Sequence, residues 1–496
     1  MNYFTANIGF DPVLSIRITE IILILYYGSY FIFDIFLFSI FLFTFRKKKH
    51  LKHEDNLFSD HSVTIIVPAY NEDVSIVNCI RMLMNLDYPN YEIIAVNDGS
   101  SDRTTKNILE SFSLKQVENQ IVNNINTQRI ERVFQSNDKR FVLIDKINGG
   151  KADAVNVGIN AAKSDYICTI DADSILDKFA LKDVMTSFIQ DKSVFVSGGQ
   201  LAISNDTHIE NNKIVNAKMP SNIWVLWQIV EYIKSFMISR TGLSKLNALL
   251  IMSGAFSIYK KVDLLNVGGF LTRLNTHEYI LEKLGKNKST VCEDMEIVVR
   301  LWRYNREIKK KVKVVFMPQP ICWTEVPDKS TNLLKQRNRW HRGLAETLFL
   351  HREILFEPAY GATGLLAFPY YLFYELLAPI IKIITVFFLF GIFLSGLINV
   401  YWAILILLTV TIISALITST TTVFIENWSR KQTSSNRDAL RYKNIWNWLG
   451  LVSASIIGNF SYIHFRTFAQ IGGIIDFFKK STDWKKFDRV GIITNK

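Results

Sequence analysis

The sequence predicts an α/β domain with a mainly parallel sheet, flanked by transmembrane helices on both sides. Two observations support this prediction. Short runs of β-branched and aliphatic residues alternate with helical patterns between residues 63 and 171, which is the order typical of a parallel sheet. The chain of 496 residues is also 49% hydrophobic, with a mean hydropathy of +0.15, which is too apolar for a purely soluble protein.

The excess of basic residues fits a membrane surface better than a nucleic acid. The net charge is +12, but the bases cluster beside apolar segments, as in residues 46–49, and no nucleic-acid-binding motif accompanies them. The four cysteines are widely spaced and lie between the outer apolar regions, at positions 79, 168, 292 and 322. This spacing predicts a reduced, cytosolic middle part with neither a disulfide framework nor a zinc site.

The first apolar segment, residues 21–45, is long enough to cross a bilayer. It is too long for the core of a signal peptide and has no small-residue cleavage site, so we expect a retained helix. The basic cluster after it places the following residues in the cytoplasm and the N-terminus outside. Asp34 interrupts the segment, and either packs against another helix or lines a polar path.

Two strands are predicted next, at residues 63–67 and 91–96. The first ends in the loop Pro68-Ala69-Tyr70-Asn71-Glu72, which leads into a helical pattern over residues 74–86. The second ends in a turn signal at residues 97–102 that opens another helix. Asp98 in this turn is either a simple turn former or, because it follows a strand of such a sheet, a hydrogen-bonding partner for a nucleotide base.

A third strand is predicted at residues 141–144, after a weakly patterned stretch rich in Asn and Gln at residues 112–137 that we interpret as a surface insertion. Residues 148–158 then supply glycines for a tight turn, Lys151, and a helix whose N-terminus can face an anion. The spacing differs from that of a Walker A loop. A solvated Lys151 is the alternative.

Two carboxylates one residue apart, Asp171 and Asp173, end a short buried strand predicted at residues 166–170. Alternation along the strand turns both to the same side, at the edge where open α/β sheets bind ligands. Hard oxygen ligands placed together suit Mg²⁺ or Mn²⁺ carrying a diphosphate. A solvated acidic turn is the alternative.

Further candidates follow in the second half of this domain. Residues 194–200 predict a strand and a turn, and residues 251–259 an apolar segment with a small-residue turn. Glu293 and Asp294 then precede an amphipathic run, where a carboxylate either complements the helix dipole or acts as a general base. Residues 336–342, Gln-Arg-Asn-Arg-Trp-His-Arg, read alone, fit a basic amphipathic surface helix.

Three apolar regions make up the C-terminal third. Residues 364–390 and 401–425 have spanning length, with a short turn between them, and a third region covers residues 445–475. Three full crossings would leave the basic tail after residue 478 outside, whereas the positive-inside rule favours basic segments in the cytoplasm. We therefore predict that the third region re-enters the membrane or lies in its interface.

Three charged residues interrupt these apolar regions: Glu375, Lys382 and Arg466. Such charges are costly in a membrane unless they line a polar path, which suits a channel for a glycan. Lys382 can alternatively extend its amine to the membrane surface.

Taken together, six motifs in this order resemble the family-two glycosyltransferases of the GT-A fold, and within them the membrane-embedded processive branch with poly-β-1,6-N-acetylglucosamine, hyaluronan, chitin and cellulose synthases. The motifs are Pro68-Ala69-Tyr70-Asn71-Glu72, Asn97-Asp98-Gly99-Ser100, Asn148-x-Gly150-Lys151 with Asn156 and Gly158, Asp171-Ala172-Asp173, Glu293-Asp294 and Gln336-x-x-Arg339-Trp340. Cys292 departs from the pattern, which often has Thr there. Residues 112–137 and 272–289 are unmatched insertions, which leaves substrate specificity open.

The resemblance implies a role for each motif residue on the donor side. Asp98 contacts the uridine, Lys151 the diphosphate, and Asp173, with Asp171 beside it, holds Mg²⁺ or Mn²⁺ on the leaving UDP. Residues of the first loop also belong to the nucleotide-sugar site: Pro68, Tyr70 and Glu72.

On the acceptor side, the resemblance implies that Asp294 removes the proton from the acceptor hydroxyl, so that in-line attack inverts the anomeric carbon. Four further residues are implied at the acceptor and diphosphate end: Glu293, Gln336, Arg339 and Trp340. There, an indole can stack on a sugar and a guanidinium can hydrogen-bond the diphosphate or the glycan.

The implied function is metal-dependent, inverting transfer from a UDP-sugar, best matched by UDP-N-acetylglucosamine, to a growing β-linked polysaccharide that is exported. The alternatives are a single transfer to a lipid-linked acceptor and a membrane scaffold with an inactive transferase domain. The implied partners are a UDP-sugar, a glycan acceptor and the bilayer, with an accessory membrane subunit left open and no nucleic acid.

The predicted organisation has four parts: a membrane helix with its basic flank at 1–50, a transferase domain at 55–345, interfacial and transmembrane helices at 346–478, and a basic tail at 479–496. The predicted location is the plasma membrane, with several crossings and a cytoplasmic catalytic domain.

Overall fold

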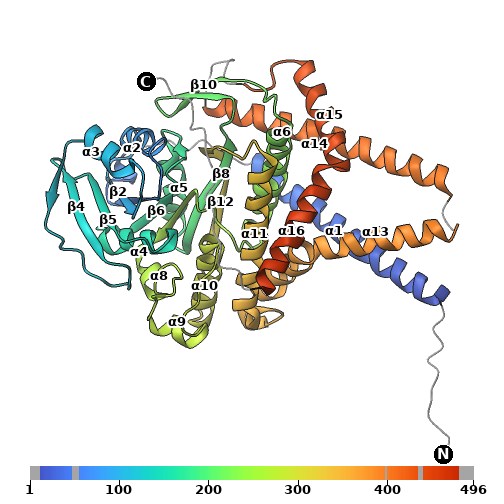
Figure 1. The fold of residues 1–496 in the computed structure, drawn as a ribbon, viewed down its shortest axis with the longest axis horizontal. Coiled ribbons are helices and arrows are strands. Elements are labelled where there is room, and N and C mark those ends of the chain that lie inside the picture. Colours follow the sequence, from blue (N-terminus) through green and yellow to red (C-terminus); the bar gives the residue numbers. More distant parts are fainter. Residues whose placement is uncertain (1–11, 47–54, 397–398, 434–439, 480–496) are drawn as a thin grey trace, which may run out of the picture.

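The computed structural model describes residues 12–46, 55–396, 399–433 and 440–479. The predicted basic residues at 47–49 and most of the predicted tail lie outside this part of the chain. A mixed α/β domain lies at one end of the molecule, and long apolar helices project from the other end (Figure 1). The helices between these parts include α6 (Ile223–Glu231), α11 (Ser330–Leu350) and α16 (Tyr462–Phe478).

The predicted parallel sheet is confirmed. Its centre consists of four parallel strands in the spatial order β5 (Phe141–Lys146), β2 (Tyr91–Asp98), β1 (Val63–Ala69) and β6 (Tyr166–Ile170). In the register, Val63 lies opposite both Tyr91 and Tyr166. Because these strands are buried on both faces, each is a nearly continuous apolar run that ends at the same edge of the sheet.

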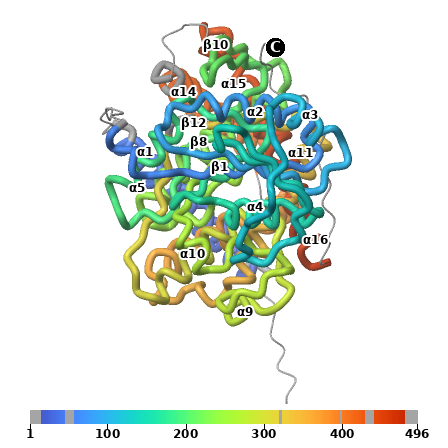
Figure 2. Tube along the Cα trace, turned by 90° about the vertical axis from the view of Figure 1, so that its left-hand side faces the viewer, coloured from blue at the N-terminus to red at the C-terminus, as the bar shows by residue number. Residues whose placement is uncertain are grey.

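Helices cover both faces of the sheet (Figure 2). Side chains of α2 (Ile76–Met84), α3 (Thr104–Ser111) and α5 (Ala180–Gln190) pack on one face, and those of α4 (Lys151–Ala161) and α10 (Glu293–Glu307) on the other. Neighbouring residues of β1 alternate between the two layers, with Ile65 in one core and Ile66 in the other. Gly158 brings α4 close to β1, because a Cβ there would lie 2.5 Å from Cγ2 of Ile66.

The other half of the sheet is mixed. β11 (Phe256–Lys260) runs antiparallel to β6 and to β8 (Val194–Ile203), and β8 pairs in parallel with β12 (Lys313–Thr324). The predicted turn at residues 197–200 is wrong, because these residues continue β8. Gly198 serves close packing instead, because a Cβ there would lie 2.7 Å from Sδ of Met252.

The predicted surface insertion at 112–137 is also wrong in part. It contributes two strands to the sheet edge, β3 (Leu114–Val117) and β4 (Ile130–Ser136), with β4 antiparallel to β5. Several of their residues are exposed, so the apolar pattern is weak. Ile125 between them is buried, and its N–H donates to Oδ1 of Asn160 at 3.0 Å.

Short elements complete the domain and its junction with the membrane helices. The strands are β7 (Ile175–Leu176) at the far sheet edge and the hairpin β9 (Thr207–Glu210) and β10 (Lys213–Ala217). The helices are η1 (Asp55–Leu57), η2 (Tyr232–Ile238), α7 (Ser239–Lys245), α8 (Lys261–Asn266), α9 (Glu278–Lys283), η3 (Arg352–Ile354), η4 (Pro358–Tyr360), η5 (Thr363–Ala367), α12 (Phe368–Tyr370) and η6 (Tyr371–Leu376). Helix α9 lies within the second unmatched insertion, and η2 is a π-helix that joins α6 to α7.

Two helices in the described part of the chain are long and apolar enough to cross a membrane. They are α1 (Pro12–Arg46) and α14 (Val400–Thr433). A third candidate is the pair formed by residues Thr363–Leu376 and α13 (Ala378–Leu394), which is bent by 46°.

The third apolar region forms two helices, α15 (Ile445–Phe460) and α16, with a break at Ser461. Neither is among the candidate spans. Our prediction that this region re-enters the membrane or lies in its interface therefore stays open.

The long helices are fastened to the α/β domain by polar contacts. Oδ2 of Asp34 in α1 lies 2.9 Å from Nζ of Lys234 in η2, so Asp34 packs against a neighbouring helix. Arg441, which follows α14, is 1% exposed and donates to the carbonyl of Ile203 at 2.9 Å. It also forms an ion pair with Glu426 of α14 at 3.2 Å.

Candidate active site

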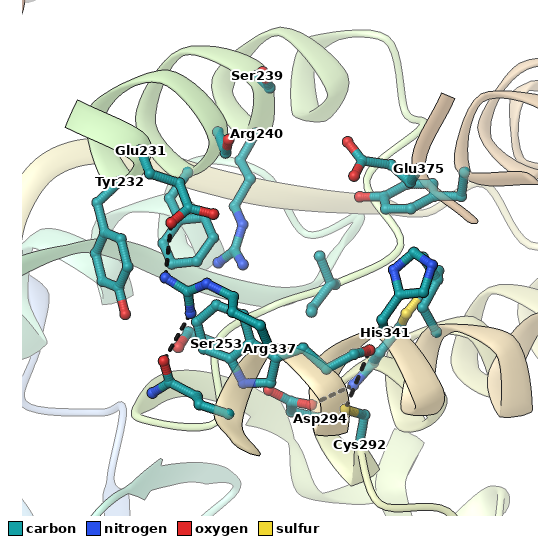
Figure 3. A pocket seen from close by; sticks show the side chains of 18 of the residues that line it. Glu231, Tyr232, Ser239, Arg240, Ser253, Cys292, Asp294, Arg337, His341 and Glu375 are labelled. Atoms are coloured by element: carbon teal, nitrogen blue, oxygen red, sulfur yellow. Dashed lines mark hydrogen bonds and ion pairs between the residues drawn. The ribbon is translucent and has the colours of Figure 1, made fainter. Parts of the chain in front are cut away.

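One cavity of about 370 Å³ connects the sheet edge with the membrane helices. Residues after β6 and at the start of α10 line one end, and α11 lines the middle. The other end lies among α1, η6, α13 and α16, with Tyr26, Tyr370, Tyr374, Glu375 and Lys382 in its wall. Figure 3 shows that side chains from α6, α7, α10 and α11 converge on the middle of this cavity.

The first end of the cavity holds the predicted lysine and acidic pair. Asp171 and Asp173 both line it, and Asp173 is 7% exposed. Nζ of Lys151 lies 2.6 Å from Oδ1 of Asp171 and 3.3 Å from Oε1 of Glu293. Burial alone would lower the pKa of Lys151, but Asp171 and Glu293 raise it above its usual range. Lys151 is therefore a permanent cation beside these carboxylates.

These carboxylates fit a divalent cation only when a ligand completes its coordination. Within the described ranges, no group of three or more His, Cys, Asp or Glu side chains is arranged to hold a metal. Mg²⁺ usually binds one or two carboxylates together with phosphate oxygens and water. Asp171 and Asp173 supply such oxygens on one cavity wall, so the donor set suits a metal that arrives with a diphosphate.

Asp294 lies in the first turn of α10 and is oriented by the backbone. Its Oδ2 accepts a hydrogen bond from the N–H of Gly254 at 3.0 Å, and its Oδ1 accepts one from the N–H of Met295 at 2.9 Å. Burial raises the pKa of Asp294, Glu293 raises it further, and Lys151 opposes both effects. This arrangement gives a fixed carboxylate suited to accepting a proton.

The predicted residues of α11 line the middle of the cavity: Gln336, Arg339 and Trp340. The centre of the Trp340 ring lies 5.9 Å from the ring of Phe236 in η2. On another side, the guanidinium of Arg337 lies 4.2 Å from the Trp340 ring. Arg337 also donates from Nη1 to Oε1 of Gln336 at 2.7 Å. Trp340 and Gln336 are therefore both held by Arg337.

Glu231 in α6 organises a charged cluster that sequence reasoning missed (Figure 3). Arg337 donates to it at 2.7 Å, Arg466 of α16 at 3.1 Å and the hydroxyl of Tyr462 at 2.5 Å. Arg466, which interrupts the third predicted apolar region, therefore has a carboxylate partner. The available signal was a glutamate within an otherwise apolar helical stretch, which indicates a buried pair.

Cys292, the residue that departs from the family pattern, packs directly under α11. Its thiol lies 3.8 Å from the carbonyl oxygen of Arg339, to which it can donate. A Cβ added to Gly343 would lie 2.2 Å from the sulfur. Burial, with Asp294 nearby, raises the pKa of Cys292 well above its usual range, so the thiol stays protonated.

Four predicted residues do not line this cavity: Pro68, Tyr70, Glu72 and Asp98. The carboxylate of Asp98 is buried, pairs with Lys146, and accepts the N–H groups of Gly149 at 2.9 Å and Gly150 at 2.8 Å. Asp98 thus shapes the turn that precedes Lys151. Its predicted contact with uridine stays a prediction.

The first loop is tied to the turn after β2. The N–H of Asn71 donates to the Ser100 hydroxyl at 2.9 Å, and the N–H of Glu72 donates to the Thr104 hydroxyl at 2.8 Å. Asn71 has a φ of +54°, a conformation that Asn tolerates better than most residues. The structure therefore brings the first two motifs together, beside the edge where Lys151 begins its helix.

Comparison with known proteins identifies the family. A family model described as Glycosyltransferase like family 2 matches residues 61–343. Poly-beta-1,6-N-acetyl-D-glucosamine synthases from Staphylococcus epidermidis and Staphylococcus aureus (strain COL) are 27% and 26% identical over 287 and 297 residues. These alignments cover 58% and 60% of this chain, but only 55% and 58% of the relatives, so the chain spans little more than half their length.

Solved structures with detectable similarity include the mannosyltransferase PcManGT from Pyrobaculum calidifontis in complex with GDP-Man and Mn²⁺. It is 14% identical, covers 93% of this chain and 99% of its own, and has a TM-score of 0.49. S. aureus TarS 1-349 in complex with UDP-GlcNAc is 14% identical. The match covers 81% of this chain and 91% of the TarS chain, with a TM-score of 0.38.

The family match covers more than half of the chain and contains all six motifs. Together with the mixed α/β sheet, it confirms the predicted GT-A class and the prediction that the chain is a glycosyltransferase. The chain therefore belongs to the family-two glycosyltransferases.

Proposed function

We propose that this glycosyltransferase transfers a sugar from a UDP-sugar, with UDP-N-acetylglucosamine as the first candidate, to a growing β-linked polysaccharide. One observation carries the proposal: a single cavity joins Lys151 and the acidic residues to Trp340 and then to the membrane helices. A sugar added at the first end can thus remain bound while its chain extends toward the second. The similarity to poly-beta-1,6-N-acetyl-D-glucosamine synthases supports the choice of sugar.

The first end of the cavity is the proposed donor site. Asp171 and Asp173 would hold Mg²⁺ or Mn²⁺, which neutralises charge on the leaving UDP. Lys151, already cationic, would bind the diphosphate by charge-assisted hydrogen bonds. The nucleoside would lie over the joined turns after β1 and β2, beside four residues: Pro68, Tyr70, Glu72 and Asp98.

Asp294 is the proposed general base. Its carboxylate is held by two backbone N–H groups on the wall shared by the donor end and the α11 segment. It would accept the proton of the acceptor hydroxyl as the oxygen attacks the anomeric carbon and the bond to UDP breaks. Attack from the face opposite the leaving group inverts the configuration of that carbon.

We further propose that the α/β domain is cytoplasmic and that the polymer leaves through the membrane end of the cavity. Tyrosines and charged residues line that end, which suits a glycan rich in hydroxyl groups. Crossings by α1, the bent pair and α14 would put the chain after α14 back on the side of the domain, where Arg441 docks. This proposal keeps the predicted domain boundaries at residues 50, 55, 345 and 478.

A panel of UDP-sugars tests the function. The full chain, purified and placed in lipid nanodiscs with Mg²⁺ or Mn²⁺, should release UDP from one sugar nucleotide and form a polymer that can be sized. A small product soluble in organic solvent would instead indicate one transfer to a lipid-linked acceptor. Absence of UDP release from every donor would indicate an inactive domain.

A further inference from the structure

Arg240 in α7 is a buried cation that points into the middle of the cavity (Figure 3). Its side chain is 7% exposed. Three other cations of the same cavity have carboxylate partners: Lys151 has Asp171, and both Arg337 and Arg466 have Glu231. Arg339, which also lines the cavity, donates to the carbonyl of Val291 at 3.2 Å. Among the described residues, Arg240 has no ion pair or hydrogen bond, and its close partner is the Phe236 ring, 4.1 Å from the guanidinium carbon.

A buried guanidinium without acceptors is costly unless a ligand supplies them. Burial lowers the pKa of Arg240, but an arginine remains protonated at any physiological pH. It carries five N–H donors and no acceptor, so it selects oxygen atoms that accept hydrogen bonds. Its place in a cavity wall gives these donors access to a bound molecule.

The neighbours of Arg240 indicate which part of the substrate lies there. Phe236 contacts both Arg240 and the ring of Trp340, so the guanidinium borders the aromatic surface on which we place the acceptor sugar. Tyr371 of η6 and Asp294 line the same cavity as Arg240. Arg240 therefore lies in the middle of the cavity, beside Phe236 and Trp340, whereas Lys151 and the acidic pair mark the donor end.

We propose that Arg240 recognises the acceptor sugar by donating hydrogen bonds to the carbonyl oxygen of an acetamido group, while Trp340 and Phe236 contact the sugar ring. This inference rests on the proposed function. A carbonyl oxygen is a strong acceptor that offers no competing donor, unlike a hydroxyl. An amino sugar without the acetyl group carries a positive charge at neutral pH and would be repelled by Arg240.

Direct binding of short oligosaccharides tests the inference without turnover. The full chain in nanodiscs is titrated with β-linked N-acetylglucosamine oligomers and with their de-N-acetylated counterparts, by calorimetry. We expect the wild type to prefer the acetylated oligomer at least about tenfold. Arg240→Met should weaken its binding roughly 10- to 100-fold, the range for a lost charge-assisted hydrogen bond, and should nearly abolish the preference. Arg240→Lys keeps the positive charge but lacks the paired N–H donors of a guanidinium. Its affinity for the acetylated oligomer should lie between those of the wild type and Arg240→Met.

A matched control is Arg352→Met. Arg352 is also stacked on a phenylalanine, 4.9 Å from the ring of Phe349, but it is exposed and lies outside this cavity. The Arg352→Met variant should bind the acetylated and the de-N-acetylated oligomers as the wild type does. Thermal unfolding and UDP affinity establish that the Arg240 variants are folded.

Three results would overturn the inference: no acetyl preference in the wild type, unchanged oligosaccharide binding in Arg240→Met, or a loss confined to UDP-sugar, which would assign Arg240 to the diphosphate. Failure of the proposed function is a separate outcome, in which oligosaccharides bind as expected but the wild type releases no UDP.

Discussion

Asp294 is fixed before any substrate arrives, because two backbone N–H groups hold its carboxylate. Burial and Glu293 raise its pKa, and a general base acts only when deprotonated. Activity should therefore be lost as the pH falls through this raised pKa, at a higher pH than the usual value of about 3.9 for aspartate.

Asp294→Asn keeps the shape of the side chain and removes the proton acceptor. We expect transfer to fall by about two orders of magnitude or more, with UDP-sugar affinity preserved and the acidic limb of the pH profile gone. Steady-state kinetics and UDP-sugar titration measure the two effects. Normal turnover at saturation combined with lost nucleotide binding would assign Asp294 to the donor instead.

Asp173→Asn tests the metal. Because charge neutralisation at the leaving group contributes several kcal/mol, UDP formation should fall by about three orders of magnitude. Binding of Mn²⁺ in the presence of UDP, measured by electron paramagnetic resonance, should weaken in parallel. Asp165→Asn is the matched control, since Asp165 is exposed and lies at the opposite end of the same strand. Full activity of Asp173→Asn, or of the wild type in excess chelator, would contradict this role.

At the scale of elements, Glu231 joins α6, α11 and α16 through Arg337 and Arg466. Glu231→Gln leaves the buried Arg337 and the half-buried Arg466 without a carboxylate, which should destabilise the protein by about 3 kcal/mol. It should also loosen Trp340, so that acceptor KM rises while UDP-sugar KM stays nearly constant. Glu353→Gln is the control, because Glu353 is 66% exposed and its pair with Arg303 should contribute at most about 1 kcal/mol. Equal destabilisation by both variants would show that the Glu231 cluster has no special role.

The same cluster gives a pH dependence with a defined sign. Burial alone would raise the pKa of Glu231, but Arg337 and Arg466 lower it from 4.5 to about 2. The folded state therefore binds this proton less readily than the unfolded state. The stabilisation is present above pH 4.5 and should be lost as the pH falls toward 2. Chemical denaturation across this range should show a smaller loss in Glu231→Gln.

Elements in the centre of the sheet could be predicted from the sequence because burial on both faces leaves a continuous apolar run between turn signals. The strand Tyr166–Ile170 was predicted residue for residue. The edge strands β3 and β4 were missed because exposed residues interrupt their pattern.

The site was predictable to the extent that motifs mark it. Strand ends and helix starts placed Lys151, Asp171 and Asp294 on one cavity. Glu231 and Arg240 belong to no motif. Glu231 and its partner Arg337 are 106 residues apart, and Arg240 meets the other residues of the cavity only in the folded chain, so only the fold reveals their roles.

For the whole molecule, α16 packs on α11 and Arg441 docks on the α/β domain, so catalytic and membrane parts are joined at several points. Sealed inverted vesicles supplied with the UDP-sugar outside should collect polymer in the lumen, protected from an added glycan hydrolase. Trp340→Ala should shorten the polymer because stacking is lost, with UDP-sugar binding unchanged. If all polymer remains hydrolase-sensitive while the vesicles stay sealed, this chain alone does not export it.

The contact between Cys292 and Gly343 has a consequence for how such a sequence can evolve. A Cβ at position 343 would lie 2.2 Å from the sulfur, and Cys292 immediately precedes the two acidic residues of α10. A larger residue at either position would push α11, with Trp340, away from Asp294. A descendant that gains bulk at 343 must therefore first lose it at 292, so the order of mutations is itself constrained.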